Sequence, residues 1–295
     1  MLSLTRLKFK LNFPGGFSLP YWLGNKFRGG FGNHLREAIC NYVDAHCKDC
    51  KRAEDCLYFV LYEKAKQKRG YAPPIRPIIF VPPFFGKELK VKENGFLDLD
   101  VLIFGDYTRY FPHLIFGLRL LGKRGLNRFS KFGISSVISV YNQQEVFDGE
   151  TLWLNLIETK GVTEFFIEPA ERIRVNLRTP LELKSLDFPI KLEDLLEMVR
   201  RRLILYVNEY GRGKVPEFDV DSSILDYRRS SHILQFRKLH PETEALGKYI
   251  GHTGHIEYEI KKIDKNAGWL LAVGQEIGAG PKSSYGMGFF SLERI

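Results

Sequence analysis

The sequence predicts an α+β protein of two tandem ferredoxin-like domains with a glycine-rich loop close to the C-terminus. Three observations lead to this prediction. Strand and helix patterns follow a similar order in the two halves of the 295 residues. Hydrophobic residues make up 44% of the chain and charged residues 27%, which is typical of a folded protein. Five glycines fall within residues 274–288, where they favour a loop that lies against a polyanion.

The first half reads as β-α-β-β-α-β with one further strand. Apolar and polar residues alternate over residues 2–13, which is the period of a strand rather than of a signal peptide. Prolines make residues 75–85 an edge strand or an extended arm. The other strands are predicted at residues 96–104, 133–141 and 151–158, and the helices at residues 25–44, 57–68 and 107–121.

The second half repeats the theme. A strand at residues 172–177 precedes a helix whose apolar stripe runs from Leu192 to Tyr206. Four more strands are predicted at residues 233–239, 254–260, 269–273 and 286–292, the last two flanking the glycine-rich loop. We therefore divide the chain into domains at residues 1–160, with a cysteine insertion at residues 40–70, and 161–295, with the loop at residues 274–288.

The charge of the chain indicates the kind of partner. Lysine and arginine exceed aspartate and glutamate by 44 to 35, which gives a net charge of +9 and a pI of about 9.2. This excess favours nucleic acid or an anionic surface. No apolar run reaches the roughly 18 residues of a membrane span, so we expect a cytoplasmic protein without membrane contact.

The glycine-rich loop differs from the two common nucleotide loops. Pro281 stands where a P-loop has glycine, and Ser283 stands where a dinucleotide loop has its third glycine. The loop is either a phosphate site or a mobile hairpin without a ligand, and the cation of Lys282 favours the phosphate site. Arg172, Arg174 and Arg178 share one strand face, which is either an RNA-binding surface or a solvated face.

The cysteines form a compact group. All four lie within seventeen residues, and Cys47 and Cys50 make a C-x2-C pair between Cys40 and Cys56. Four thiolates match the ligand count of a structural zinc site. An iron–sulfur cluster uses the same ligands, and two disulfides or buried free thiols are the alternatives.

Two of the seven histidines lie in or just after the first predicted helix. His34 lies in this helix near Arg28, and His46 follows it. A ribonuclease without a metal needs a base for the 2′-OH, an acid for the 5′-oxygen and cations for the phosphate, and histidine titrates in the useful range. The residues alone do not choose between the two histidines.

Several segments together resemble one family. The spacing Gly274-x3-Gly278-x-Gly280-x-Lys282-x-Ser284-x-Gly286-x-Gly288-Phe289 is similar to the C-terminal motif of the CRISPR-associated precursor-crRNA processing endoribonucleases of the RAMP superfamily. Residues 174–184 resemble the strand that opens the C-terminal domain of this family, and residues 251–258 a later strand. Residues 27–36 resemble its first helix, and the cysteines before Leu57 and Tyr58 resemble a branch with a four-cysteine cluster.

The resemblance implies a tandem RAMP/RRM-like fold that cleaves CRISPR repeat RNA without a metal. Attack by the 2′-OH then leaves a 2′,3′-cyclic phosphate. The resemblance favours His46 as the catalytic residue and His34 as the second choice. Lys282, Ser284 and Tyr285 carry over as RNA contacts. The full expected RNA-binding set is Arg28, Arg172, Arg174, Arg178, Gly278, Gly280, Lys282, Ser284 and Tyr285.

Two alternatives stay open beside the nuclease. A non-catalytic RAMP subunit would hold the crRNA in an effector complex with the same loop and basic faces. A zinc-stabilised RNA-binding protein outside CRISPR systems is the third interpretation. In each of the three cases we expect RNA as the partner and a structural zinc ion at most. For the nuclease and for the RAMP subunit, we expect that RNA to be CRISPR repeat RNA or crRNA, with other CRISPR effector subunits as further partners.

Overall fold

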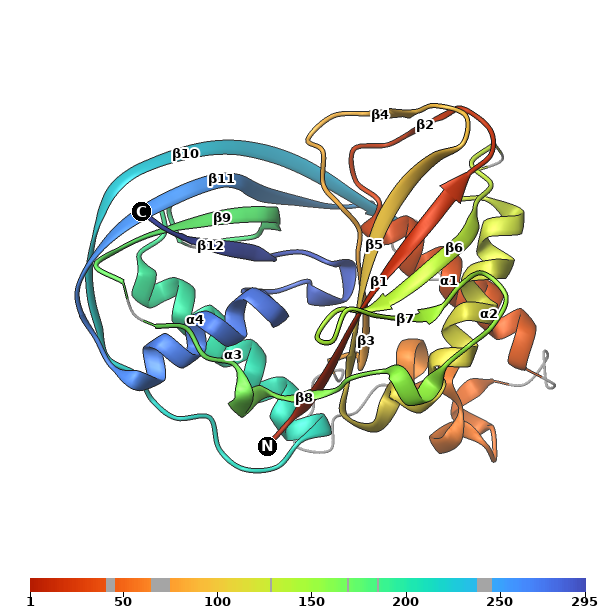
Figure 1. The fold of residues 1–295 in the computed structure, drawn as a ribbon, viewed down its shortest axis with the longest axis horizontal. Coiled ribbons are helices and arrows are strands. Elements are labelled where there is room, and N and C mark those ends of the chain that lie inside the picture. Colours follow the sequence, from red (N-terminus) through yellow and green to blue (C-terminus); the bar gives the residue numbers. More distant parts are fainter. Residues whose placement is uncertain (41–45, 65–74, 128, 169, 185, 238–245) are drawn as a thin grey trace. The chain divides into compact units, whose positions relative to one another are not determined.

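The computed structural model describes residues 1–40, 46–64, 75–127, 129–168, 170–184, 186–237 and 246–295 (Figure 1). Contacts divide the chain into two compact units. Unit 1 comprises Met1–Val162 and Leu205–Gly213, and unit 2 comprises Thr163–Ile204 and Lys214–Ile295. Residues of the last turns of α3 (Leu192–Tyr210) therefore belong to unit 1, and the Tyr206 ring stacks on that of Phe104 at a centroid distance of 3.7 Å.

Unit 1 is built on an antiparallel sheet against which α1 and α2 pack. Its main sheet has the order β3-β5-β1-β6-β7, with β8 paired to β1, and β2 pairs with β4. The strands are β1 (Ser3–Phe13), β2 (Phe17–Leu19), β3 (Ile78–Val81), β4 (Leu89–Val91), β5 (Gly95–Phe104), β6 (Gly133–Ser139), β7 (Gln144–Phe147) and β8 (Lys160–Gly161). The α-helices are α1 (Gly24–Ile39) and α2 (Phe111–Arg124).

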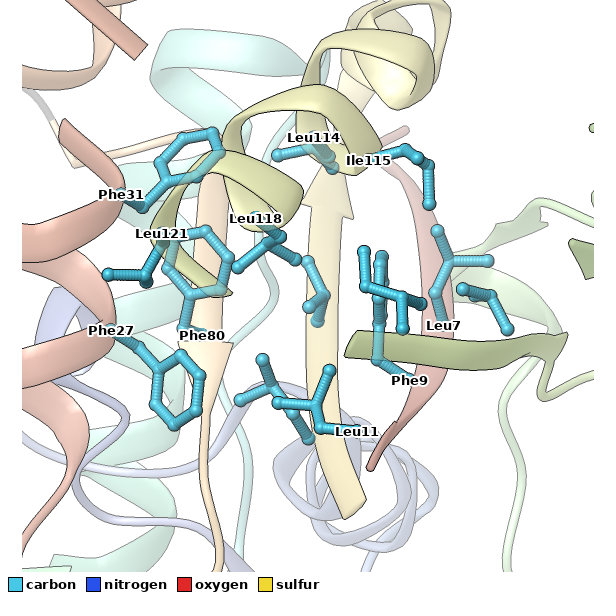
Figure 2. Close-up of a cluster of buried hydrophobic side chains, with 14 of the residues drawn as sticks. Leu7, Phe9, Leu11, Phe27, Phe31, Phe80, Leu114, Ile115, Leu118 and Leu121 are labelled. Atoms are coloured by element: carbon cyan, nitrogen blue, oxygen red, sulfur yellow. The ribbon is translucent and has the colours of Figure 1, made fainter. Parts of the chain in front are cut away.

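The core of unit 1 follows from the period of its first strand. Leu7, Phe9 and Leu11 are fully buried, whereas Lys8 and Lys10 between them are exposed. The buried side chains of β1 meet those of α1 and α2 on one face of the sheet (Figure 2). The predicted strand at residues 2–13 is thus confirmed, with its apolar face in the core.

Glycines let α1 and α2 approach each other closely. A Cβ atom on Gly30 of α1 would lie 2.6 Å from Leu121 Cδ1 of α2. A Cβ atom on Gly117 of α2 would lie 2.5 Å from Phe31 Cε2 of α1. The two glycines therefore act as holes that receive large side chains of the opposite helix.

Unit 2 repeats the topology of unit 1. Its sheet has the order β10-β11-β9-β12, formed by β9 (Arg172–Leu181), β10 (Val220–Arg237), β11 (Leu246–Ile263) and β12 (Phe290–Arg294). The helices are α3 and α4 (Lys265–Ile277). The strands β1, β3, β5 and β6 of unit 1, counted in chain order, have the spatial order second, third, first, fourth, and β9 to β12 of unit 2 have the same order. The predicted tandem ferredoxin-like α+β fold is therefore confirmed.

Residues 269–273, predicted as a strand, belong to the helix α4. The Asp264 side chain begins this helix by accepting a hydrogen bond from the Ala267 amide at 2.7 Å. A continuous apolar run fits a buried helix as well as a buried strand, so periodicity alone does not distinguish the two, and the predicted strand was wrong. Gly274 lies inside the helix, where Phe290 packs against its backbone. The glycine-rich loop accordingly begins at Gly278, between α4 and β12.

Other differences concern element lengths. Residues 151–158, predicted as a strand, contain a 3₁₀ helix at Leu154–Leu156. The predicted helix at residues 25–44 ends at Ile39, and residues 41–45 lie outside the described residues. Residues 57–68 hold a π-helix at Phe59–Glu63, and residues 65–68 also lie outside them. Within the described ranges, no helix is both long enough and apolar enough to cross a bilayer.

We predict that Gly117→Ala destabilises unit 1 even though alanine favours helices by about 1 kcal/mol. The added methyl group would overlap Phe31, and overpacking costs about 1–3 kcal/mol. Gly29→Ala on α1 is the matched control, because a Cβ atom there meets nothing within 4 Å. We expect this control to stabilise the protein. Urea unfolding of both variants checks the prediction, and equal free energies of unfolding would contradict it.

Candidate functional site

The glycine-rich loop is built around one buried arginine. Arg202 of α3 is only 3% exposed. Its guanidinium donates hydrogen bonds to the carbonyl oxygens of Ile277 at 2.6 Å and Ala279 at 2.6 Å. It also donates to Gly280 at 2.6 and 2.9 Å and to Met287 at 3.1 Å. One side chain thus ties both ends of the loop to α3.

Two glycines permit this close approach. Gly278 has φ of +73°, and a Cβ atom there would lie 2.5 Å from Arg202 Nη1. Gly288 has φ of +80°, and a Cβ atom there would collide with the carbonyl oxygen of Ala279. Any larger residue at either position would be strained and would displace the loop from the guanidinium.

The tip of the loop is the accessible part. Gly280, Lys282, Ser284 and Tyr285 are partly exposed, whereas the glycines at 278, 286 and 288 are buried. Within the described residues, the amides of Gly280 and of residues 282–284 donate no hydrogen bond to a backbone carbonyl. Gly280, Lys282 and Ser284 are partly exposed, so their amides can contact a phosphate, whereas Ser283 is buried.

Lys282 occupies a distinctive position at the tip. Its backbone is left-handed, with φ of +64°. The ammonium group lies 4.3 Å from the centre of the Tyr249 ring on β11. This cation–π contact holds the charge at the junction between the loop and the β10–β11 hairpin.

The hairpin carries further basic and aromatic side chains. Arg228 and Arg229 of β10 are exposed, and the Arg229 guanidinium lies 6.0 Å from the Phe188 ring. His232 Nε2 contacts Thr253 Oγ1 at 2.8 Å, and His252 Nδ1 contacts Ser231 Oγ at 3.0 Å. Burial lowers the pKa of both imidazoles, so neutral rings are favoured. The combination of arginines with rings suits an RNA strand.

The predicted arginine face of β9 is largely compensated by glutamates. Arg174 donates to Glu257 at 2.6 and 2.8 Å and lies 3.4 Å from Glu293. Arg172 lies 3.7 Å from Glu259, directly opposite it in the register. Arg178 is exposed. The face is therefore less basic than the sequence alone indicates.

One group of three possible metal ligands lies on the same sheet within the described residues. Ligand atoms of Asp226, His255 and Glu257 lie within 4.8 Å of one another. Glu257 already accepts two hydrogen bonds from Arg174, so a guanidinium supplies the positive charge that this carboxylate requires. We interpret the group as part of the cross-strand ion-pair ladder.

On unit 1, the first helix presents arginines over tyrosine rings. The Arg28 guanidinium lies 5.2 Å from the Tyr62 ring, and that of Arg36 lies 5.6 Å from the Tyr58 ring. The Tyr62 hydroxyl donates to the Arg28 carbonyl at 2.7 Å, and the two tyrosine rings stack. This packing fixes the segment after α1 against the helix.

The two predicted catalytic histidines have different surroundings. His34 Nδ1 lies 3.2 Å from Glu37 Oε2, and Glu37 Oε1 accepts from Arg124 at 2.9 Å. The hydrogen bond with His34 and the charge of Arg124 hold the pKa of Glu37 below its usual value. His46 is exposed on the turn before the 3₁₀ helix at Cys47–Asp49. His34 thus has a carboxylate partner that orients its ring, whereas His46 lies on an exposed turn.

The four cysteines are free thiols grouped after α1. Cys40, Cys50 and Cys56 line a pocket of about 120 Å³ together with His113. Burial, together with the charge of Glu63, raises the pKa of the Cys47 thiol. Among the described residues, no three of the sulfur atoms lie within 4.8 Å of one another. The donor set fits zinc, but the segment would have to contract around the ion.

Arg202 is the important residue that motif analysis did not identify. The spacing 195-199-202-206 places it on the buried stripe of α3, and its neighbours in that stripe are fully buried. An arginine on the apolar face of a helix predicts a buried partner, so the signal was present in the sequence. Its partners were not, because they are backbone carbonyls some 75 residues away.

Comparisons with known proteins agree with this architecture. The N-terminal domain of the AF_1859 family matches residues 2–160, and its C-terminal domain matches residues 173–292. An uncharacterized protein of Archaeoglobus fulgidus is 46% identical over 99% of this chain and 98% of its own length. The chain belongs to the AF_1859 family.

Solved structures similar to this AF_1859 member are Cas6 proteins. Cas6 (TTHB231) of Thermus thermophilus, in a product complex, gives a TM-score of 0.57 at 16% identity, covering 98% of this chain and all of that one. A partial Cas6-RT-Cas1–Cas2 complex gives 0.57 at 13% identity, covering the whole of this chain and 46% of that one. The predicted resemblance is confirmed at the level of the fold, whereas the four-cysteine branch stays a prediction.

We predict that Lys282→Ala weakens RNA binding without unfolding unit 2. Loss of one phosphate contact should reduce the slope of log affinity against log salt by roughly one unit or slightly less. Lys265→Ala is the matched control, because Lys265 is an exposed lysine at the start of α4 in the same unit. Fluorescence anisotropy over a salt series measures both variants. Equal slopes for the two would make the tip of the loop purely structural.

We predict one zinc ion per chain at the cysteine group. Elemental analysis of protein purified without chelator checks the content, and Cys50→Ser should remove the metal and lower the melting temperature. RNA affinity should change less than stability in this variant. Metal-free protein with four titratable thiols, or with two disulfides, would contradict the zinc prediction.

Proposed function

We propose that this protein is an endoribonuclease that cleaves CRISPR repeat RNA without a metal ion. The observation that carries the proposal is the glycine-rich loop, which has the family spacing and lies between α4 and β12 of a Cas6 fold. The similar Cas6 (TTHB231) and Cas6 (TTHA0078) structures are product complexes, so this fold retains cleaved product in those proteins. We infer the same substrate class here.

The proposed reaction is an intramolecular transesterification at one phosphodiester of the RNA. The 2′-oxygen at the cut site attacks phosphorus, the bond from phosphorus to the 5′-oxygen breaks, and a 2′,3′-cyclic phosphate forms. A base accepts the 2′-OH proton and an acid gives a proton to the 5′-oxygen. Cations and amide groups stabilise the additional negative charge on the pentacovalent phosphate.

His34 is our preferred proton-transfer residue, followed by His46. A carboxylate accepts from the protonated ring nitrogen, so the contact with Glu37 places the proton on Nδ1 and leaves the Nε2 lone pair available. Arg124 keeps Glu37 ionised, which favours this tautomer. His46 has the position that the family resemblance favours, yet its surroundings on an exposed turn supply no comparable orientation.

Unit 2 supplies the proposed phosphate contacts. Lys282 and the amide groups at the tip of the loop provide positive charge and donors, and Ser284 and Tyr285 beside them provide hydroxyl groups. The exposed Arg228 and Arg229 extend this surface along β10. A single-stranded flank of the repeat would then contact both charges and rings.

A non-catalytic RNA-binding subunit is the second candidate. The exposed position of His46 favours it, because the turn that carries His46 supplies no orienting group comparable to Glu37 beside His34. The similar Cas6-RT-Cas1–Cas2 complex joins a Cas6 module to other CRISPR proteins. On this reading, the same loop holds crRNA inside a larger assembly.

We predict that the purified protein cleaves repeat RNA at one position in the presence of EDTA. The upstream product should end in a 2′,3′-cyclic phosphate, detectable by mass spectrometry. A substrate with a single 2′-deoxy nucleotide at the cut site should bind but resist cleavage, because the attacking group is absent. Binding without cleavage of the all-ribose RNA would select the subunit interpretation, and absence of binding would refute both.

Variants of the histidines test the mechanism in the same assay. His34→Ala should lower the single-turnover rate by about 10²–10⁴-fold with little change in affinity. Glu37→Gln keeps a hydrogen-bonding group but removes the charge, so we expect a smaller loss of about 10–100-fold. His46→Ala is the companion variant and should retain activity. The reverse pattern would assign the role to His46, and wild-type rates in both would exclude a histidine mechanism.

A further inference from the structure

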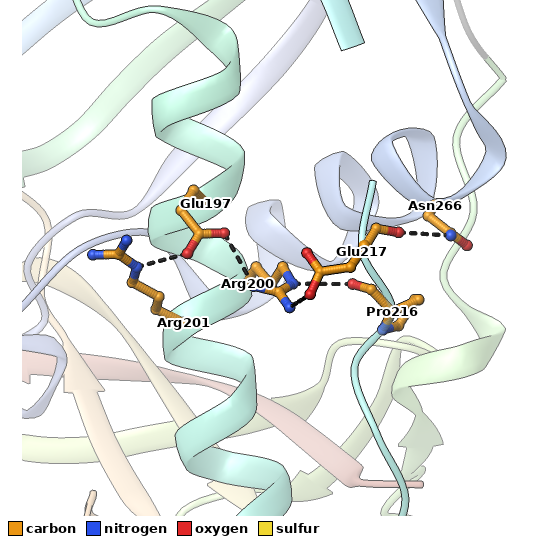
Figure 3. Close-up of polar contacts among 6 residues, drawn as sticks. All are labelled: Glu197, Arg200, Arg201, Pro216, Glu217 and Asn266. Atoms are coloured by element: carbon orange, nitrogen blue, oxygen red, sulfur yellow. Dashed lines mark hydrogen bonds and ion pairs between the residues drawn. The ribbon is translucent and has the colours of Figure 1, made fainter. Parts of the chain in front are cut away.

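Three consecutive arginines on α3 have three different environments. Arg200 donates to the Pro216 carbonyl at 3.1 Å and pairs with Glu197 and Glu217, which anchors the segment after α3 (Figure 3). Arg201 pairs with Glu197 on its own helix at 2.7 Å and is 75% exposed. Arg202 turns inward to the glycine-rich loop. The same residue type therefore serves as an anchor, a surface group and a buried donor.

We propose that Arg202 is the positioning residue of the RNA-binding loop. Its guanidinium draws the carbonyl groups of Ile277, Ala279 and Met287 inward. The Gly280 amide, which shares its peptide group with the Ala279 carbonyl, is thereby directed away from the guanidinium and is left, with the amides of Lys282 and Ser284, to contact an RNA phosphate. This inference rests on the proposed function, since it assumes that the ligand of the loop is RNA.

The geometry explains why an arginine is required. The five acceptor carbonyls, including that of Pro281 at 3.5 Å, come from both ends of the loop, and a planar guanidinium with five N–H donors reaches them in one fixed arrangement. A lysine ammonium has three donors on a flexible stem, so it would satisfy part of the set and leave other buried carbonyls without a partner. The Arg202 guanidinium also lies 5.8 Å from the Phe289 ring, which restricts its plane further.

The arrangement of dipoles adds an electrostatic argument. The Ala279 carbonyl points at the buried guanidinium, so the N–H of the same peptide group, that of Gly280, points away from it. The N–H groups of Gly278 and Gly288 donate instead to the carbonyls of Gly274 and Pro180. Lys282 has φ of +64° at this tip, which a lysine adopts only where the surrounding structure imposes it. Arg202 thus sets the direction of the Ala279–Gly280 peptide group, from which the chain continues to Lys282 at the tip.

The test uses the full-length protein with Arg202→Lys, and with Arg201→Lys as the matched control on the adjacent exposed position. Hydrogen exchange measures the amides of residues 278–288, and anisotropy measures affinity for repeat RNA. We expect Arg202→Lys to exchange faster in the loop and to bind about tenfold or more weakly, with KM raised more than kcat is lowered. Arg201→Lys should match the wild type.

Chemical rescue separates positioning from general stability. Arg202→Ala should regain part of its RNA affinity in millimolar guanidinium chloride, because the free ion can occupy the vacated position, whereas equal potassium chloride should not restore it. If Arg202→Ala does not fold, Arg202→Lys alone decides the matter. Unchanged affinity and unchanged loop exchange in Arg202→Lys would overturn the proposal.

The failure of the proposed function would look different. If neither the wild-type protein nor its variants bind repeat RNA, the proposed function is wrong. The control of the loop by Arg202 is then judged on hydrogen exchange, where slower or unchanged exchange in Arg202→Lys would refute it.

Discussion

The hydrogen bonds from Arg202 to the glycine-rich loop are the constraint on which unit 2 depends. They join the middle of α3 to the end of α4 and to the start of β12. β12 pairs with β9 immediately afterwards, so the same contact sets the closing strand of the sheet. Removing the guanidinium would leave several buried carbonyl groups without donors, and each such group costs about 1–3 kcal/mol. The glycines at 278 and 288 are required because this approach leaves no room for a Cβ atom.

Arginines inside the structure change the meaning of the positive net charge. Arg202 and Arg76 donate mainly to backbone carbonyls, and Arg174 is held by two glutamates. These residues contribute to the net charge of +9 but offer little to a polyanion. The surface that we propose for RNA instead comprises the loop tip and the exposed arginines of β10. Net charge therefore indicates the class of partner, whereas the hydrogen-bond partners of each arginine locate the interface.

The candidate site shows which features a local sequence pattern predicts and which depend on distant segments. The loop, its lysine and the histidines near α1 were predicted from motif spacing and from chemistry, because these signals are local. The preference for His34 arises only from its contact with Glu37 and from Arg124 of another helix. The arginine face on β9 was predicted from alternation, which is correct as a pattern. Its compensation by Glu257 and Glu259 depends on the register of a strand about 80 residues away.

The sequence by itself determined the fold class, the main strand and helix pattern of each half and the family resemblance, because hydrophobic periodicity and glycine spacing are properties of neighbouring residues. Tertiary structure decided what a local window leaves open. It made residues 269–273 a helix, capped by Asp264 and packed on Phe290, where the apolar run fitted either state. It also buried Arg202, one of three consecutive arginines of α3, where its guanidinium donates to the carbonyl groups of the loop. The physical reason is that burial and hydrogen-bond partners come from chain segments distant in sequence, and these fix the environment of each residue only after folding.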